Sequence, residues 1–303
     1  MRFINELKEG DNVSEVYLCK TKQALKTKAG KNYYSLILQD KTGTIDTKIW
    51  ELNSGIEHFE ALDFIKVDGQ VTTFQGTLQL NVRRVRKMQE GTYDPANYMP
   101  VSRFDIDTMY KELTGYIMRL THPYLKALAE SFFIKDAQFI KDFKSHSAAK
   151  SVHHGFVGGL LEHTLSVVKL CDFYTTRYPM LNKDLLITAA MFHDIGKTKE
   201  LSLFPANDYT DEGQLIGHIV IGVEMIHDRI REIPGFPKTL ENELKHCIVA
   251  HHGELEYGSP KKPALMEAMA LNLADNTDAK METMTELLGG VPDTLEWLGF
   301  NRV

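Results

Sequence analysis

The sequence predicts two domains, an N-terminal all-β barrel followed by an all-α helical bundle. Up to about residue 88 the apolar residues alternate with a period of two, as they do in half-buried strands. Beyond residue 104 they recur at spacings of three and four, as they do in amphipathic helices. The segment between them contains Pro95 and Pro100, which is typical of a linker. We therefore expect domains at residues 1–90 and 104–303, joined by a linker at residues 91–103.

Five strands are expected in the first domain, because five short segments are rich in β-branched and aromatic residues and are separated by turn signals. They are residues 13–18, 33–38, 44–50, 62–71 and 77–82. Two of the turns contain Gly43 and Gly76, which tolerate positive φ. A short helical piece is expected near residues 55–61, between the third and fourth strands. This order matches an OB-fold barrel, a fold that binds oligonucleotides.

Eight amphipathic helices are expected in the second domain. They are residues 104–120, 122–134, 136–143, 159–178, 183–194, 214–232, 239–251 and 262–279. No stretch approaches the roughly 18 consecutive apolar residues that a transmembrane helix requires, and the N-terminus lacks the apolar core of a signal peptide. Cys19, Cys171 and Cys247 stand singly, so we expect reduced core thiols. The sequence predicts a cytoplasmic protein that does not engage a membrane.

Charge is unevenly distributed along the chain. Residues 1–90 contain 14 Lys and Arg against 12 Asp and Glu, whereas the remaining residues contain 21 against 29. The cations of the first domain are grouped, in residues 20–31 and residues 83–87. Grouped cations suit contact with phosphates, and a solvated face is the alternative interpretation.

Aromatic side chains are interleaved with these cations, as in proteins that stack bases within a basic groove. The predicted nucleic-acid contacts are Tyr33, Tyr34, Trp50, Phe74, Lys31, Lys48, Arg83, Arg84 and Arg86. Each aromatic residue could instead belong to the core. Tyr33 and Tyr34 are adjacent and must point to opposite faces of a strand, so one of them and Trp50 are the best surface candidates. Such contacts read no base sequence, so we expect low sequence preference.

Imidazoles and carboxylates gather in the second domain without clustered thiolates. Nine of the 12 histidines lie between residues 153 and 252. The pair His193-Asp194 ends an almost continuously apolar helix, which carries both side chains into the interior, where a buried charge needs a partner. Four further donors lie on helices with inward-facing apolar stripes, namely His163, His218, His251 and Asp275. This donor set suits a divalent metal, although any one histidine alone could be a core residue.

A second His-Asp pair, His227-Asp228, lies among charged neighbours and is expected to be unrelated to the metal site. Lys197 follows the first pair through Gly196, which is expected to allow a tight exit from the helix. Its ammonium group would provide a point charge for a phosphate oxygen.

The order His163, His193-Asp194, Asp275 resembles the H…HD…D motif of the HD-domain metal-dependent phosphohydrolases, over about residues 145–285. With the OB-like domain and the segment 153–164, nearly the whole chain resembles the YhaM family of bacterial 3′→5′ exoribonucleases. The resemblance implies that His163, His193, Asp194 and Asp275 surround one metal. Asp194 would bridge to a second metal held by His218 and His251, and His252 would either replace His251 or lie behind the ligands.

The resemblance also bears on the kind and number of metal ions. It favours manganese, while the ligand chemistry also accepts iron, cobalt or zinc. The glutamate that binds a third metal in some relatives is absent, because Gly159 stands at its position. Two divalent ions are therefore expected.

The resulting expectation is a 3′→5′ exoribonuclease that hydrolyses the phosphodiester bonds of single-stranded RNA, with Asp194 and Lys197 in catalytic roles. His154 would bind the substrate or have a core or capping role. Two alternatives remain, a phosphohydrolase of small nucleotides and a non-catalytic single-strand-binding protein with a structural metal. RNA and single-stranded DNA are not distinguished by the sequence. The apolar segment 286–303 would pack on its own bundle or form a homo-oligomer.

Overall fold

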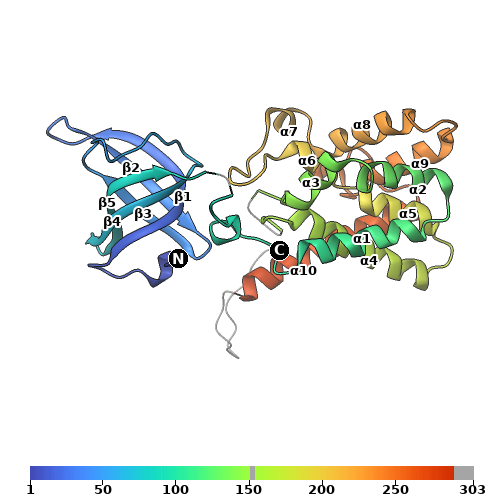
Figure 1. Cartoon of the computed structure of the whole chain (residues 1–303). Helices are drawn as coiled ribbons and strands as arrows, with labels where there is room; N and C mark the ends of the chain where they lie inside the picture. Colours follow the sequence, from blue (N-terminus) through green and yellow to red (C-terminus); the bar gives the residue numbers. More distant parts are fainter. Residues whose placement is uncertain (90, 151–153, 290–303) are drawn as a thin grey trace, which may run out of the picture. The chain divides into compact units, whose positions relative to one another are not determined.

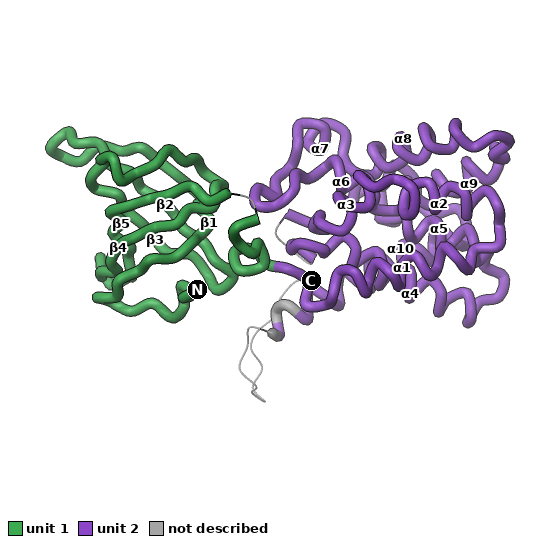
Figure 2. Tube along the Cα trace, in the orientation of Figure 1, with its two compact units in different colours: residues 1–100 green, residues 101–303 purple. Residues whose placement is uncertain are grey.

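The chain forms two compact units, Met1–Pro100 and Val101–Val303 (Figure 2). A computed structural model describes residues 1–89, 91–150 and 154–289. Most of the apolar segment 286–303 therefore lies outside the described residues. The first unit is a β-barrel and the second is helical, as expected from the change in periodicity (Figure 1).

The first unit is a closed barrel of five strands in the order β1-β2-β3-β5-β4. The strands are β1 (Asn12–Lys26), β2 (Asn32–Asp40), β3 (Gly43–Ile49), β4 (Phe64–Phe74) and β5 (Thr77–Lys87). Neighbouring strands pair antiparallel except β3 and β5, which are parallel. This is the topology of the OB-fold. The β4–β5 hairpin turns at Gln75 and Gly76 with φ of 50° and 84°, which the strand twist favours.

The connection between β3 and β4 corrects one prediction, because no helix forms at residues 55–61. The backbone there pairs with β5 instead. The amide of Val85 donates to the carbonyl of Gly55, and its carbonyl accepts from the amide of Glu57. Phe59 is fully buried in the barrel core, with Tyr34 edge-on against it. Backbone groups committed to β5 cannot also close the bonds of a helix.

The segment expected as a linker contains two aromatic residues that pack on the barrel. Tyr93 stacks on Phe64 of β4 with ring centroids 4.0 Å apart, and Tyr98 meets Phe64 edge-on. The carbonyl of Tyr98 accepts a hydrogen bond from the Gln39 side chain. Residues 93–98 therefore belong structurally to the first unit.

The second unit is a bundle of helices. They are α1 (Ile106–Arg119), α2 (Pro123–Phe133), α3 (Ala137–Ser145), α4 (Gly159–Arg177), α5 (Lys183–Phe192), α6 (Lys197–Glu200), α7 (Asp211–Leu215), α8 (His218–Arg231), α9 (Lys238–Val249) and α10 (Met266–Gly289). The single helix expected at 214–232 is broken at Gly217, whose φ of 79° and ψ of 153° are not helical. This break makes His218 the first residue of α8.

Helix α5 lies in the middle of the bundle and positions the functional residues. It packs against α2, α4, α9 and α10 (Figure 1). Every side chain from Leu185 to Phe192 is buried, so the apolar run is explained by contact on all sides. The helix then delivers His193 and Asp194 to the interior. Among the described helices, none has both the length and the apolar character needed to span a bilayer.

A buried carboxylate, Glu241 of α9, forms ion pairs within α9 and to His227 of α8. The carboxylate of Glu241 is 5% exposed and accepts hydrogen bonds from Lys245, Lys238 and His227. Burial opposes its charge, but these donors outweigh burial and lower the pKa of Glu241 to about 2. His227, from the second His-Asp pair, is thus used in a structural contact.

We expect Glu241→Gln to destabilise the helical unit by about 1–2 kcal/mol at neutral pH. The folded pKa lies below the unfolded one, so the carboxylate stabilises the fold above about pH 4.5 and loses this effect as the pH falls towards 2. Urea unfolding followed by circular dichroism should give a difference that shrinks as the pH is lowered. Glu243→Gln is the control, because Glu243 has no ion pair among the described residues. A difference independent of pH would contradict the assignment.

Candidate metal centre

The structure brings together all six residues that the sequence suggested as metal ligands. His163 lies on α4, His193 and Asp194 follow α5, His218 begins α8, His251 follows α9, and Asp275 lies on α10. Asp194 is at the middle, with only 2% of its surface exposed. Its two carboxylate oxygens face two different groups of side chains.

The first group surrounds the Oδ2 atom of Asp194. This oxygen lies 3.4 Å from the Nε2 atoms of both His163 and His193. The two Nε2 atoms are 3.1 Å apart. The Oδ1 atom of Asp275 lies 3.2 Å from Nε2 of His163 and 3.9 Å from Nε2 of His193. Two imidazoles and two carboxylates therefore point at one small volume.

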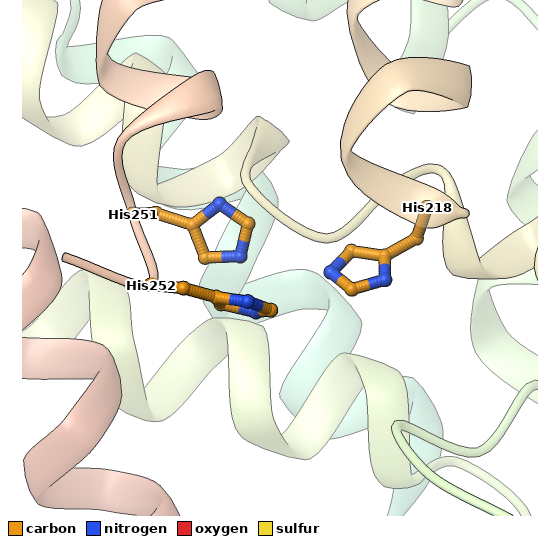
Figure 3. Close-up of side chains that lie close together, drawn as sticks. All are labelled: His218, His251 and His252. Atoms are coloured by element: carbon orange, nitrogen blue, oxygen red, sulfur yellow. The ribbon is translucent and has the colours of Figure 1, made fainter. Parts of the chain in front are cut away.

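The second group surrounds the Oδ1 atom of Asp194. It lies 3.5 Å from Nε2 of His218 and 3.7 Å from Nε2 of His251. The rings of His218, His251 and His252 point towards one another, and one nitrogen of each lies within 4.8 Å of the others (Figure 3). The sequence left open which of His251 and His252 is used. The structure places both rings at this position.

All five histidines are oriented through their Nδ1 atoms. The partners of Nδ1 are Asp278 for His163 (2.6 Å), the Ala190 carbonyl for His193 (2.8 Å), Glu200 for His218 (3.0 Å), the Ile248 carbonyl for His251 (2.7 Å) and the Tyr257 carbonyl for His252 (2.8 Å). A carbonyl oxygen only accepts, so Nδ1 carries the hydrogen in His193, His251 and His252. In each neutral ring the Nε2 lone pair therefore faces the centre, as in a metal-binding histidine.

These donors fit divalent cations. Two atoms each bound about 2.1 Å from one ion lie about 3.0–3.4 Å apart, and the closest spacings of the first group are 3.1 to 3.4 Å. In the second group, Asp194 Oδ1, His218 Nε2 and His251 Nε2 are buried and have no hydrogen-bond partner among the described residues. Converging buried acceptors without a partner are costly, and a cation satisfies them.

The two groups differ in their electrostatics. Burial opposes the protonation of His163, but hydrogen bonds to Asp275 and Asp278 outweigh it and raise its pKa. In the second group, burial lowers the pKa of His251 well below the ordinary value, and the neighbouring His252 lowers it further. Neutral imidazole is the metal-binding form. The first group is therefore rich in carboxylate, and the second is rich in neutral imidazole.

Lys197 places a cation directly beside Asp194. Its ammonium nitrogen lies 2.7 Å from Asp194 Oδ2, and 14% of its side chain is exposed. Burial opposes the charge of Asp194, but Lys197 and His193 hold its pKa well below the usual range. Burial also opposes the charge of Lys197, whose pKa the Asp194 carboxylate raises. Lys197 is thus a charged ammonium group paired with the Asp194 carboxylate.

Asp278 and Glu200 complete the centre and were missed by the sequence reasoning. Asp278 accepts hydrogen bonds from His163, His154 and Ser166. It lies three residues after Asp275, on the same side of α10, and this helical spacing was the available signal. Glu200, on α6, accepts from the ring and the backbone amide of His218. Both carboxylates set ring orientation from behind the predicted ligands.

His154 lies behind the centre. It is 2% exposed, and its Nε2 atom lies 2.9 Å from the Asp278 carboxylate. Its φ of 61° is unusual for a residue with a side chain. A Cβ atom at Gly159 would lie 2.0 Å from the His154 carbonyl oxygen. Position 159 therefore has no room for a glutamate, the residue that the resemblance would require there for a third metal.

Gly196 has a different role from the one expected. Its φ of −61° is helical, so positive φ is not required. A Cβ atom there would lie 2.0 Å from the His218 carbonyl oxygen. The glycine therefore allows α6 to approach the start of α8, which brings His218 to Asp194.

The centre opens into a cleft of about 770 Å³ within the helical unit. Four of the six predicted ligands line it, namely His163, Asp194, His218 and Asp275. His252 and the ammonium group of Lys197, which is paired with Asp194, face the same space. Its other walls include Tyr209, Tyr257, Lys262, Met269, Asn272 and Asn276. This volume exceeds what a closed structural metal requires and is large enough for a nucleotide.

On the barrel, the structure separates the two candidate tyrosines. Tyr33 stacks on Trp50 with ring centroids 4.7 Å apart, and Trp50 is 43% exposed. The Trp50 indole nitrogen donates to the side chain of Asn81 at 2.8 Å. Tyr34 instead packs on Phe59 of the barrel core. Tyr33 and Trp50 therefore form the outward aromatic pair, and Tyr34 does not belong to it.

The remaining barrel candidates are exposed to different degrees. Phe74, at the end of β4, is 58% exposed. Lys31 pairs weakly with Glu51, whereas Lys48 is largely covered and pairs with Asp46. Strand β5 carries four exposed cations. Lys87 pairs with Asp63 at 2.8 Å, whereas Arg83, Arg84 and Arg86 form no ion pair with another described residue. Arg83 and Arg84 line a surface hollow of about 820 Å³ together with Trp50.

Comparison with known families agrees with this architecture. Residues 160–280 match the family described as the HD domain, a range that spans every predicted metal ligand. The helical unit therefore contains an HD domain, the module of a superfamily of metal-dependent hydrolases. The chain is an HD-domain protein with an N-terminal OB-fold barrel.

Solved structures similar to the barrel include the second OB-fold domain of replication protein A from Methanococcus maripaludis. The identity is 22%, the match covers 30% of this chain and 98% of that one, and the TM-score is 0.24. An OB domain from Thermoplasma acidophilum is 19% identical over 31% of this chain and 90% of that one, with a TM-score of 0.24. A replication protein A heterotrimer bound to single-stranded DNA is 16% identical over 29% and 65% of the two chains, with a TM-score of 0.23.

We expect Asp278→Asn to weaken metal binding about 10- to 100-fold, because His163 would lose the carboxylate that orients its ring. Manganese titration in competition with a metal-binding dye measures this change. Asp228→Asn is the matched control, since Asp228 is an exposed helical carboxylate of the same unit. Equal affinity in the two variants would show that Asp278 does not support the centre.

Proposed function

We propose that this protein is a metal-dependent 3′→5′ exoribonuclease that hydrolyses phosphodiester bonds of single-stranded RNA. The observation that carries the proposal is the bridging position of Asp194, between two groups of donors in an open cleft. This arrangement suits two divalent cations, of which manganese is favoured by the resemblance to the YhaM family. The choice of RNA and the direction of digestion rest on the same resemblance.

The residues of the cleft have separate roles in the proposed phosphodiester hydrolysis. Divalent cations, when bound, polarise the phosphoryl group and lower the pKa of a water molecule. Lys197 neutralises negative charge on the phosphate, because its ammonium group faces the cleft beside Asp194. Asp278 and Glu200 hold the imidazoles in place, so little reorganisation is needed during the reaction.

An open cleft argues against a purely structural metal. Structural sites are closed by protein ligands, whereas catalytic sites keep a position for water or substrate. Here His163, Asp194, His218 and Lys197 all line the cleft, so a ligand in it reaches the donors. A non-catalytic binding protein would have no use for this access.

The barrel favours a polymer over a small nucleotide. The Tyr33–Trp50 stack, with Arg83 and Arg84, which pair with no carboxylate in the described part of the chain, suits binding of a single strand through its bases and phosphates. A phosphohydrolase of small nucleotides would leave these features without a function. A division of labour, with binding by the barrel and hydrolysis by the helical unit, accounts for both.

The direct test is incubation of 5′-labelled single-stranded RNA with the protein and manganese. Digestion from the 3′ end gives a ladder of shortened products that all retain the label, and a chelator stops it. Asp194→Asn should abolish shortening, while Asp228→Asn, in the second His-Asp pair, should leave it intact. Loss of the label as a mononucleotide would indicate the opposite polarity. Hydrolysis of free nucleotides with intact RNA would favour the small-nucleotide alternative.

We expect Trp50→Ala to weaken binding of single-stranded RNA about 5- to 100-fold, because one stacking platform is lost. Fluorescence anisotropy of a labelled oligonucleotide measures this change, with the Asp194→Asn background preventing digestion. Phe173→Ala is the control, since Phe173 is an exposed aromatic residue of the helical unit outside the cleft. Unchanged affinity in Trp50→Ala would remove the barrel face from the proposal.

A further inference from the structure

The cleft beside the metal centre contains an aromatic ring with no assigned task. Tyr257 lines this cleft and is 72% exposed, although large aromatic side chains are usually covered. Among the described residues, no ring or cation stacks on it and no hydrogen bond reaches its hydroxyl group. By contrast, Tyr209 of the same cleft has the ammonium group of Lys150 6.0 Å from its ring centroid.

The backbone that carries this ring is tied to the metal centre. The carbonyl oxygen of Tyr257 accepts the Nδ1 hydrogen bond of His252 at 2.8 Å. Tyr257 ends a short 3-10 turn that begins at Leu255, and Gly258 follows with φ of 86°. The same residue therefore orients a donor of the centre through its backbone and presents a ring to the cleft through its side chain.

The loop is anchored on both sides of the ring. Ser259 is 3% exposed, and its hydroxyl group donates to the carbonyl of Val249 near the end of α9. On the other side, Gly253 approaches Asn272 of α10 so closely that a Cβ atom would lie 2.5 Å from the Asn272 side chain. Because the backbone is already fixed, stacking on Tyr257 costs little loop ordering.

The chemistry of the cleft indicates what the ring contacts. The histidine and carboxylate donors and Lys197 address a phosphate, and an exposed planar ring close to a phosphate site suits the base of the attached nucleotide. Met269 and Asn276 of α10 are also exposed and line the same cleft, offering an apolar surface and an amide. The Tyr257 ring and the Met269 side chain would contact the face of a base, and the Asn276 amide would contact its edge.

We propose that Tyr257 is a substrate-positioning residue that stacks on the base of a nucleotide next to the scissile phosphodiester. This inference rests on the proposed function and adds a base-binding position inside the hydrolytic cleft, separate from the barrel. Stacking uses the π-face that all bases share, so this contact selects nucleic acid over simple phosphodiesters without selecting a base sequence.

The test is a cycle that combines a protein change with a substrate change. Wild type, Tyr257→Ala and Tyr257→Phe are assayed with manganese on single-stranded RNA and on matched strands with one abasic nucleotide at each of the last three 3′ positions. Tyr257→Ala should lower kcat/KM on intact RNA about 5- to 100-fold, and Tyr257→Phe should retain activity because the ring suffices. When the missing base is the one that stacks on Tyr257, wild type and Tyr257→Ala should cleave the abasic strand with equal kcat/KM.

Two controls separate stacking from disturbance of the centre. Manganese affinity should be unchanged in Tyr257→Ala, because His252 is held by the Tyr257 carbonyl oxygen and not by its ring. Tyr178→Ala, at an exposed tyrosine outside the cleft, should behave as wild type. The inference is overturned if Tyr257→Ala has wild-type kcat/KM, or if its defect is the same on intact and all abasic strands. Absence of RNA shortening by the wild type would instead overturn the proposed function itself.

Discussion

The buried carboxylate of Asp194 is the constraint on which the helical unit depends. A carboxylate with 2% exposure is costly unless charges and hydrogen-bond donors surround it. Lys197 provides one cation at 2.7 Å, on the side of Oδ2. The Oδ1 atom has no partner among the described residues and faces the lone pairs of His218 and His251. The protein fold alone leaves this side unsatisfied, so the arrangement is explained by cation binding.

The imidazoles can converge because other groups fix their orientation first. Backbone carbonyls at the ends of α5 and α9 take the Nδ1 hydrogens of His193 and His251. These carbonyls are accessible because the last residues of a helix lack the amide partner four residues further on. The Ile248 carbonyl also accepts the backbone amide of His251. A histidine just beyond a helix C-terminus therefore turns its Nε2 atom away from the helix and into the bundle. The same geometry occurs twice in the centre.

The sequence predicted the elements that depend on local pattern. The apolar run of α5 indicated burial on all sides, and the pair His193-Asp194 at its end indicated a buried polar site. The alternation of apolar residues predicted five strands in the first unit, and their succession along the chain suggested the OB-fold barrel that the structure contains. These features follow from residue periodicity, which is fixed before any tertiary contact forms.

Other features depend on tertiary contacts and were not predictable in this way. Asp278 and Glu200 act on rings that lie 115 and 18 residues away in the chain. The segment at 55–61 has helix-compatible composition, but its backbone pairs with Val85 of β5. The need for glycine at position 196 arises from the approach of α8 and not from its own φ. In each case the deciding partner is distant in sequence.

The charge of the centre accounts for the two sets of carboxylates, those among the predicted ligands and those behind the histidines. Asp194, Asp275, Asp278 and Glu200 carry about four negative charges against the single positive charge of Lys197. In the proposed form with two divalent cations, the local sum would be about +1 with neutral imidazoles. Fewer carboxylates would leave a larger uncompensated charge in a buried site, and more would repel an anionic phosphodiester. In the proposed form, the carboxylates behind the histidines would therefore tune affinity for the metal and the substrate together.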